Sequence, residues 1–250
     1  MEVAEHIDAL EAAGEGLADA AGRAGLDAPV PACPGWVVRD LVQHTGGVHR
    51  WATRFVQGER EWIGDDFEQL AGGWPPDAEL PAWFRDGHAA LVAALRAAPA
   101  DLECFTFLRA PSPLAMWARR QAHETQIHEV DAAAAAGTTV TPATELALDG
   151  IDELLAAFAP RRRTGFRLDP ARALAVCPDD GDVRWVVVIG PEGITTTRTT
   201  PDDDLAADAA IAGPAATLYL WLWNRASLDA LRPAGDRTLL TAWTDRVKIT

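Results

Sequence analysis

The segment MWARRQAHETQIHEVDAAAAAG, residues 116–137, predicts a long helix with ionisable side chains along one face. Its alanines and long unbranched side chains favour a helix, and Gly137 is the kind of residue at which a helix ends. Glu124 and His128 stand four residues apart, about 40° apart around the axis, and Asp131 follows on the same stripe. If this face points inward, a bound metal ion would offset the cost of burying these groups unpaired.

Three further helices are expected before this one. Apolar residues recur at spacings of three and four in the first 24 residues, between residues 37 and 56, and in WFRDGHAALVAALRAA at 83–98. Prolines between the first two segments forbid a continuous helix there. Four long helices joined by loops predict a four-helix bundle, a fold that builds metal sites from carboxylates and histidines on facing helices.

The periodicity of the chain changes near residue 148. A further helix is expected over 149–163, and helical spacing returns in 201–225 and 237–247. Between them, three runs of period 2 predict an antiparallel meander: residues 171–177, 183–189 and 194–200. We therefore expect an α+β chain with two domains. Residues 1–148 would form the helical bundle, and residues 149–250 a smaller α+β domain containing an antiparallel sheet.

Composition and charge exclude several classes of protein. Of the 250 residues, 48% are hydrophobic and 24% are charged, so the chain can bury a core and is not largely disordered. A formal net charge of −15 disfavours nucleic acid and anionic membranes as partners. The sequence has no run of 18 apolar residues, no export-signal pattern at its start, and three cysteines without metal-clip or redox spacing. We therefore expect a cytoplasmic protein.

A third metal ligand would have to come from another helix. His44 is the candidate because it follows Leu41 by three residues and precedes Val48 by four, on the buried side of its helix. His49 is rotated about 140° from His44, so a straight helix cannot aim both at one ion, and we expect His49 behind the site or at the surface. The alternative is a solvated glutamate–histidine pair worth ~0.3 kcal/mol.

The remaining candidates are given structural roles. His123 lies about 100° away from the ionisable stripe of its helix, and His6 and His88 are expected at the surface. Asp131 could equally be a surface acid near the end of its helix. Cys33 is interpreted as a small packed residue at a helix start.

Three segments resemble one known family. VPACPGWVVRDLVQHTGGVHRWA (30–52) and RRQAHETQIHEVDAAAA (119–135) resemble the two signature segments of the mycothiol-dependent maleylpyruvate isomerase family, and LYLWLWNR (218–225) resembles part of its C-terminal domain. The resemblance implies a DinB-like four-helix bundle followed by that domain. It also implies a zinc ion held by His44, Glu124 and His128, and an arginine important for activity. Arg225 is the nearest match, although it could instead cap the end of its helix.

A site of this kind activates a thiol. Three protein ligands leave a position open on zinc or another divalent metal, and a thiol bound there ionises readily. The thiolate would add to an electron-poor carbon of an unsaturated acid. Rotation about the resulting single bond, followed by elimination of the thiol, would then give the isomer. If the substrate carried a leaving group instead, the thiol would replace that group and the reaction would be an S-transfer. Arg225 would orient the substrate carboxylate and stabilise the developing enolate.

We therefore expect a metal-dependent enzyme that uses mycothiol for isomerisation or S-transfer on a small electrophile, as a monomer or homodimer. Two alternatives remain open. The same fold could retain the metal for hydrolytic or detoxifying chemistry, or the chain could be a non-catalytic protein that binds a small molecule.

Overall fold

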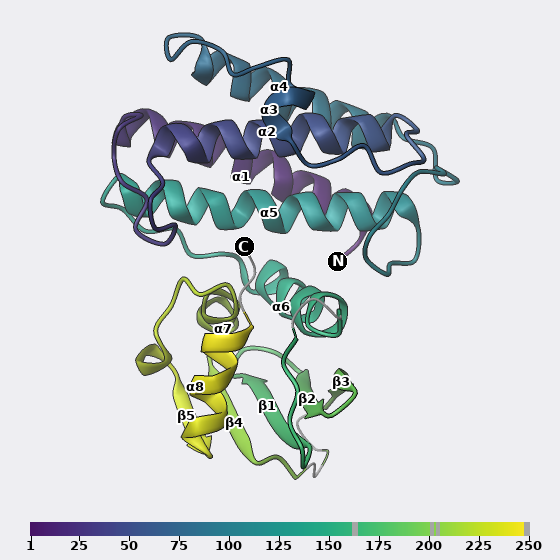
Figure 1. Cartoon of the computed structure of the whole chain (residues 1–250), viewed down its shortest axis with the longest axis vertical. Helices are drawn as coiled ribbons and strands as arrows, with labels where there is room; N and C mark the ends of the chain where they lie inside the picture. The colour runs from purple at the N-terminus through teal and green to yellow at the C-terminus, as the bar shows by residue number, and fades with distance from the viewer. Residues whose placement is uncertain (162–164, 201–202, 204–205, 248–250) are drawn as a thin grey trace. The chain divides into compact units, whose positions relative to one another are not determined.

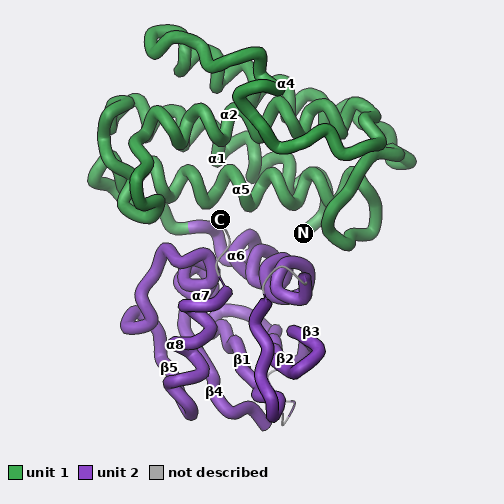
Figure 2. The backbone as a smooth tube through the Cα atoms, in the orientation of Figure 1, with its two compact units in different colours: residues 1–141 green, residues 142–250 purple. Residues whose placement is uncertain are grey.

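The computed structural model describes residues 1–161, 165–200, 203 and 206–247, which form two compact units. The first unit comprises Met1–Thr141 and the second Pro142–Thr250 (Figure 2). The boundary expected from the sequence, between residues 148 and 149, falls inside helix α6 (Thr144–Asp152). The connection lies earlier because Gly137, at a φ of 70°, follows the end of the preceding helix, and α6 begins soon after it.

Unit 1 is built from four long helices and one short one (Figure 1). Their bounds are α1 Val3–Ala24, α2 Val38–Val56, α3 Phe67–Leu70, α4 Leu80–Ala97 and α5 Pro113–Ala135. α1 packs along α5 and α4, and α2 packs against α4 and α5. The expected helical bundle is therefore confirmed.

The core of unit 1 follows the apolar stripes of α1, α2 and α4. Leu10, Leu17, Leu41, Phe55 and Leu91 are all fully buried, and each such side chain contributes roughly 1.5–3 kcal/mol to folding. Helix α5 differs because it also buries many polar groups: Arg120, Gln121, His123, Thr125, Gln126, His128 and Asp131. Buried polar groups are costly unless they are paired. The residues that pair with the polar side chains of α5 therefore mark the part of unit 1 where reactive groups gather.

The described residues of unit 2 include a five-stranded sheet with the order β3-β2-β1-β4-β5. The strands are β1 Arg172–Pro178, β2 Arg184–Gly190, β3 Gly193–Thr199, β4 Ala209–Gly213 and β5 Arg232–Gly235. The first three form the expected antiparallel meander, with Val176 opposite Trp185 and Val186 opposite Thr197. β4 runs parallel to β1, so the sheet as a whole is mixed.

Two elements of unit 2 differ from the sequence expectation. Residues 209–213 form the inner strand β4, not a helix, because pairing with β1 and β5 overrides the helical preference of its alanines. The helix expected over 149–163 begins earlier, as α6, and continues as a π-helical segment, Glu153–Phe158, while residues 162–163 lie outside those described. Helices α7 (Ala215–Leu222) and α8 (Arg237–Arg246) follow the predicted spacing. Within the described residues, no helix is both long and apolar enough to cross a membrane.

Candidate metal centre

The structure brings His44 of α2 together with Glu124 and His128 of α5. Each residue offers one ligand atom, and the three atoms lie within 4.8 Å of one another. Nε2 of His44 and Nε2 of His128 are each 3.3 Å from the same atom, Glu124 Oε1. The two imidazole rings stand almost perpendicular, at 82°. Two nitrogens and one carboxylate oxygen therefore converge from two helices.

These distances fit a tetrahedral ion. With metal–ligand bonds of about 2.0–2.2 Å, neighbouring ligands in a tetrahedron lie roughly 3.3–3.5 Å apart, and each imidazole nitrogen lies 3.3 Å from the glutamate oxygen here. Two histidines and one glutamate are also a ligand set of catalytic zinc sites, in which a fourth position stays open. The residues present thus fit a zinc ion.

Gly47, three residues after His44 on α2, lets an aromatic ring pack against the site. A Cβ atom on Gly47 would lie 2.7 Å from Cβ of Phe67, so only glycine lets α3 approach α2 this closely. The ring of Phe67 then packs edge-on against His44, with centroids 5.6 Å apart. A glycine inside a helix lowers stability by about 1 kcal/mol relative to alanine. At Gly47 this cost is accompanied by the close packing of Phe67 on His44.

The loop before α2 supplies a second aromatic contact to the site. The ring centroid of Trp36 lies 5.1 Å from that of His44 and 6.4 Å from that of His128, nearly parallel to the latter. Backbone hydrogen bonds hold this loop, since Val30 N donates to Trp36 O and Trp36 N donates to Cys33 O, both at 3.0 Å. The two imidazoles are therefore packed against a fixed aromatic ring.

Two neighbours of the trio were not assigned to the site from the sequence. Arg120 is buried, and one guanidinium nitrogen lies 3.4 Å from Glu124 Oε2, which leaves Oε1 facing the histidines. Asp131 is also buried, and its Oδ2 accepts a hydrogen bond from His128 Nδ1 at 3.1 Å. Their spacing in the sequence could have indicated both contacts, because Arg120 lies four residues before Glu124 and Asp131 lies three residues after His128, which places each pair on one face of a helix. Asp131 is therefore not a surface acid.

The electrostatics of the site favour a positive charge among its carboxylates. Burial raises the pKa of Glu124, but hydrogen bonds from His128 and His44 outweigh it and hold that pKa well below its usual value. Burial lowers the pKa of His128, yet Asp131 and Glu124 together raise it to about 9. A positive charge on the His128 imidazole is thus stabilised between Asp131 and Glu124.

Solvent reaches the trio from one side. The side chains of His44 and Glu124 are 28% and 20% exposed, whereas that of Asp131 behind His128 is fully buried. The trio is therefore partly open to solvent on the side of His44 and Glu124.

The other histidines of unit 1 are buried. His88 was expected at the surface, but its Nε2 lies 3.2 Å from Glu11 O, and its ring fills a notch that a Cβ on Gly14 would close. His49 lies in the core, where its Nε2 is 2.9 Å from Thr125 Oγ1. Helices distant in sequence enclose both rings.

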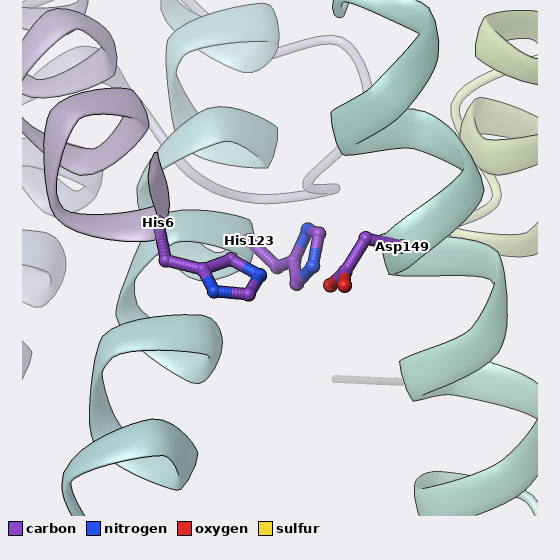
Figure 3. Close-up of side chains that lie close together, drawn as sticks. All are labelled: His6, His123 and Asp149. Carbon is purple, nitrogen blue, oxygen red and sulfur yellow. The ribbon is translucent and has the colours of Figure 1, made fainter. Parts of the chain in front are cut away.

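His6 was also expected at the surface and is likewise buried. It lies on α1 and packs edge-on against the buried His123 of α5, with ring centroids 6.1 Å apart (Figure 3). Asp149, drawn in the same figure, belongs to α6 of the second unit.

Arg225 lies just after α7 in unit 2. Its backbone N donates to Leu220 O, and its Nη1 donates to Trp223 O, both at 2.7 Å. The side chain thus satisfies a carbonyl at the end of α7, which is the helix-capping role named above as the alternative to a role in activity.

Sequence profiles match both units. The profile of the mycothiol maleylpyruvate isomerase N-terminal domain matches residues 7–133, and that of the MDMPI C-terminal domain matches residues 145–242. The chain belongs to the mycothiol maleylpyruvate isomerase family. The family resemblance is therefore confirmed, and with it the prediction of a thiol-using isomerase enzyme.

Solved structures share the fold of this family member. A crystal structure of the mycothiol-dependent maleylpyruvate isomerase has a TM-score of 0.64 and 15% identity, covering 94% of this chain and 93% of that one. A histidine-to-alanine mutant of that isomerase gives a TM-score of 0.65 at 14% identity with the same coverage. At such low identity the likeness establishes the fold. No curated protein matches the chain.

Proposed function

We propose that this chain is a zinc-dependent enzyme that uses mycothiol for isomerisation or S-transfer on a small, carboxylated electrophile. The observation that carries the metal assignment is the convergence of His44 Nε2 and His128 Nε2 on Glu124 Oε1, at 3.3 Å each. Membership of the mycothiol maleylpyruvate isomerase family supports the thiol and the type of reaction.

The residues around the trio hold the ligand atoms for this chemistry. A bound zinc ion, or another divalent metal, would lower the pKa of a thiol in its open position and so favour the nucleophilic thiolate. Arg120 contacts the second oxygen of Glu124 and keeps Oε1 directed at the histidines. Trp36 and Phe67 pack against the ring of His44 and restrict its orientation. A preformed ligand set spends little free energy on reorganisation when it binds the ion.

Arg225 is proposed as the residue that binds the substrate carboxylate. The assignment rests on the resemblance of residues 218–225 to the family's C-terminal domain. A guanidinium group suits the role because it binds a carboxylate through two parallel hydrogen bonds and remains charged as the substrate gains electron density.

Metal analysis tests the ligand set. The wild-type protein, purified without chelator, should hold stoichiometric zinc, and His44→Ala and His128→Ala should each lose it while keeping the helical circular dichroism. His49→Gln is the matched control because it removes an imidazole from the same helix outside the trio, and it should keep its zinc. Unchanged metal content in both ligand variants would refute the site.

Binding and turnover test the thiol and the arginine. Mycothiol should bind the zinc-loaded protein, measured by calorimetry, and equal affinity for the chelated protein would contradict the mechanism. Arg225→Ala should lower the turnover of a maleylpyruvate-like substrate more than it lowers zinc occupancy. Full activity in that variant would assign the carboxylate to another residue.

A further inference from the structure

We propose that Cys33 is a positioning residue of the metal centre, acting on His128 through the carboxylate of Asp131. The inference rests on the proposed function of that centre and adds to it a residue that packs at the start of α2.

One carboxylate oxygen receives both contacts. Cys33 Sγ donates to Asp131 Oδ2 at 3.6 Å, a length within the range of sulfur hydrogen bonds, and His128 Nδ1 lies 3.1 Å from the same oxygen. On the opposite edge of the imidazole, Nε2 faces Glu124 Oε1. The order along this line is therefore thiol, carboxylate, imidazole and ligand position.

These contacts orient the imidazole of His128 and so set the direction of the lone pair on its Nε2. A histidine that donates from Nδ1 to a carboxylate is fixed in the tautomer whose Nε2 can bind a metal, and its ring is oriented at the same time. The terminal torsion of an aspartate is broad, so each donor to Oδ2 restricts its position further. The second donor, Cys33, holds Oδ2 beside His128.

The loop that carries Cys33 is suited to this task. Cys33 N donates to Val30 O at 3.1 Å and Cys33 O accepts from Trp36 N at 3.0 Å, so its backbone is fixed on both sides. The same loop places the ring of Trp36 on His128. The thiol and the indole thus restrain one imidazole from two directions.

The weakness of the thiol as a donor also matters. A lysine or arginine in this position would hold the carboxylate more strongly, but it would add a second positive charge, after that of Arg120, close to a metal cation. A neutral S–H group orients Asp131 and leaves its negative charge available to His128.

The test compares donors of similar size at position 33. Cys33→Val fills the space without a donor, and Cys33→Ser keeps a donor on a shorter side chain. Cys177→Val, at a half-buried cysteine on β1, is the control. Zinc affinity is measured by competition with a chromogenic chelator, and the visible spectrum of the cobalt-loaded protein reports the ligand geometry.

We expect Cys33→Val to bind zinc about 10-fold more weakly and to change the cobalt spectrum, in line with other groups that orient a metal ligand. Cys33→Ser should bind zinc more tightly than Cys33→Val, and Cys177→Val should match the wild type. A residue that only packs would lower the thermal midpoint of the metal-free protein without this order of affinities. Cys33→Ala provides the donor-free comparison if the valine does not fold.

The possible failures are distinguishable. If Cys33→Val and Cys33→Ala bind zinc as the wild type does, or if the serine is no better than they are, the role of Cys33 is refuted while the trio stands. If the wild type and Cys177→Val bind no zinc at all, both the role of Cys33 and the proposed function are overturned.

Discussion

Burial of His49 makes the stability of unit 1 depend on pH. The ring is fully buried, Nε2 meets Thr125 Oγ1, and Nδ1 has no hydrogen-bond partner within the described part of the chain. Burial, reinforced by the charge of the nearby His88, lowers the pKa of His49 well below 6.5. The folded protein therefore keeps this imidazole neutral.

The sign and size of the effect follow from linkage. As the pH falls through 6.5, the unfolded chain binds a proton at His49 and the folded chain does not, so unfolding becomes easier. The stability contribution is complete above that pH and is lost below it. Between pH 7.5 and pH 5.5, one histidine that stays neutral in the fold accounts for at most about 1.4 kcal/mol.

The variant His49→Gln isolates this contribution. An amide retains a hydrogen-bonding group for Thr125 and does not titrate, so the free energy of unfolding should fall about 1.4 kcal/mol less than in the wild type over the same pH range. Urea unfolding with chelator present, followed at 222 nm, measures both. Thr125→Val keeps the buried imidazole and should keep the wild-type pH dependence. Identical pH dependence in wild type and His49→Gln would refute the account.

Three further outcomes are expected. In Gly46→Ala the new Cβ would lie 2.3 Å from Cζ3 of Trp83, so the variant should unfold more easily by roughly 1–3 kcal/mol in calorimetry. Gly22→Ala, with nothing within 4 Å, should instead gain up to about 1 kcal/mol, and equal effects would contradict the packing argument. Asp131→Asn should weaken zinc binding ~10- to 100-fold, measured by chelator competition, whereas the exposed Asp19→Asn should not. A chelator should lower the thermal midpoint of the zinc-loaded protein, because an ion present at 100 times its Kd adds about 2.7 kcal/mol, and an unchanged midpoint would argue against a bound ion.

Helical spacing predicted most of unit 1 because it reports which face of a helix is buried. The same argument placed His44 on the inner side of α2 and Glu124 and His128 on one stripe of α5, and the structure brings these three together. Spacing within one helix could not find the partners of the other polar residues. Cys33 and Asp131 are 98 positions apart, and only the folded bundle makes them neighbours.

Two of the predictions made from the sequence are wrong for the same physical reason. His88 stands among alanines and glycine, which suggested a surface position, but the notch at Gly14 of another helix receives its ring. The strand at Ala209–Gly213 contains three alanines whose local preference is helical, and pairing with two neighbouring strands of the sheet fixes it as a strand. In both cases tertiary contacts override what the local sequence indicates.

The hydrogen bond between His49 and Thr125 ties the stability of the bundle to its chemistry. Thr125 adjoins Glu124 on α5, and His49 follows His44 by five residues on α2, so this contact fixes the offset of the two helices beside the ligand atoms. A ligand set drawn from two helices needs that offset to hold within about 0.5 Å. The contact that requires His49 to be buried, at a cost in desolvation, is therefore the same contact that helps to hold the proposed metal ligands in place. Substitutions that loosen the contact between α2 and α5 should weaken zinc binding even where they touch no ligand.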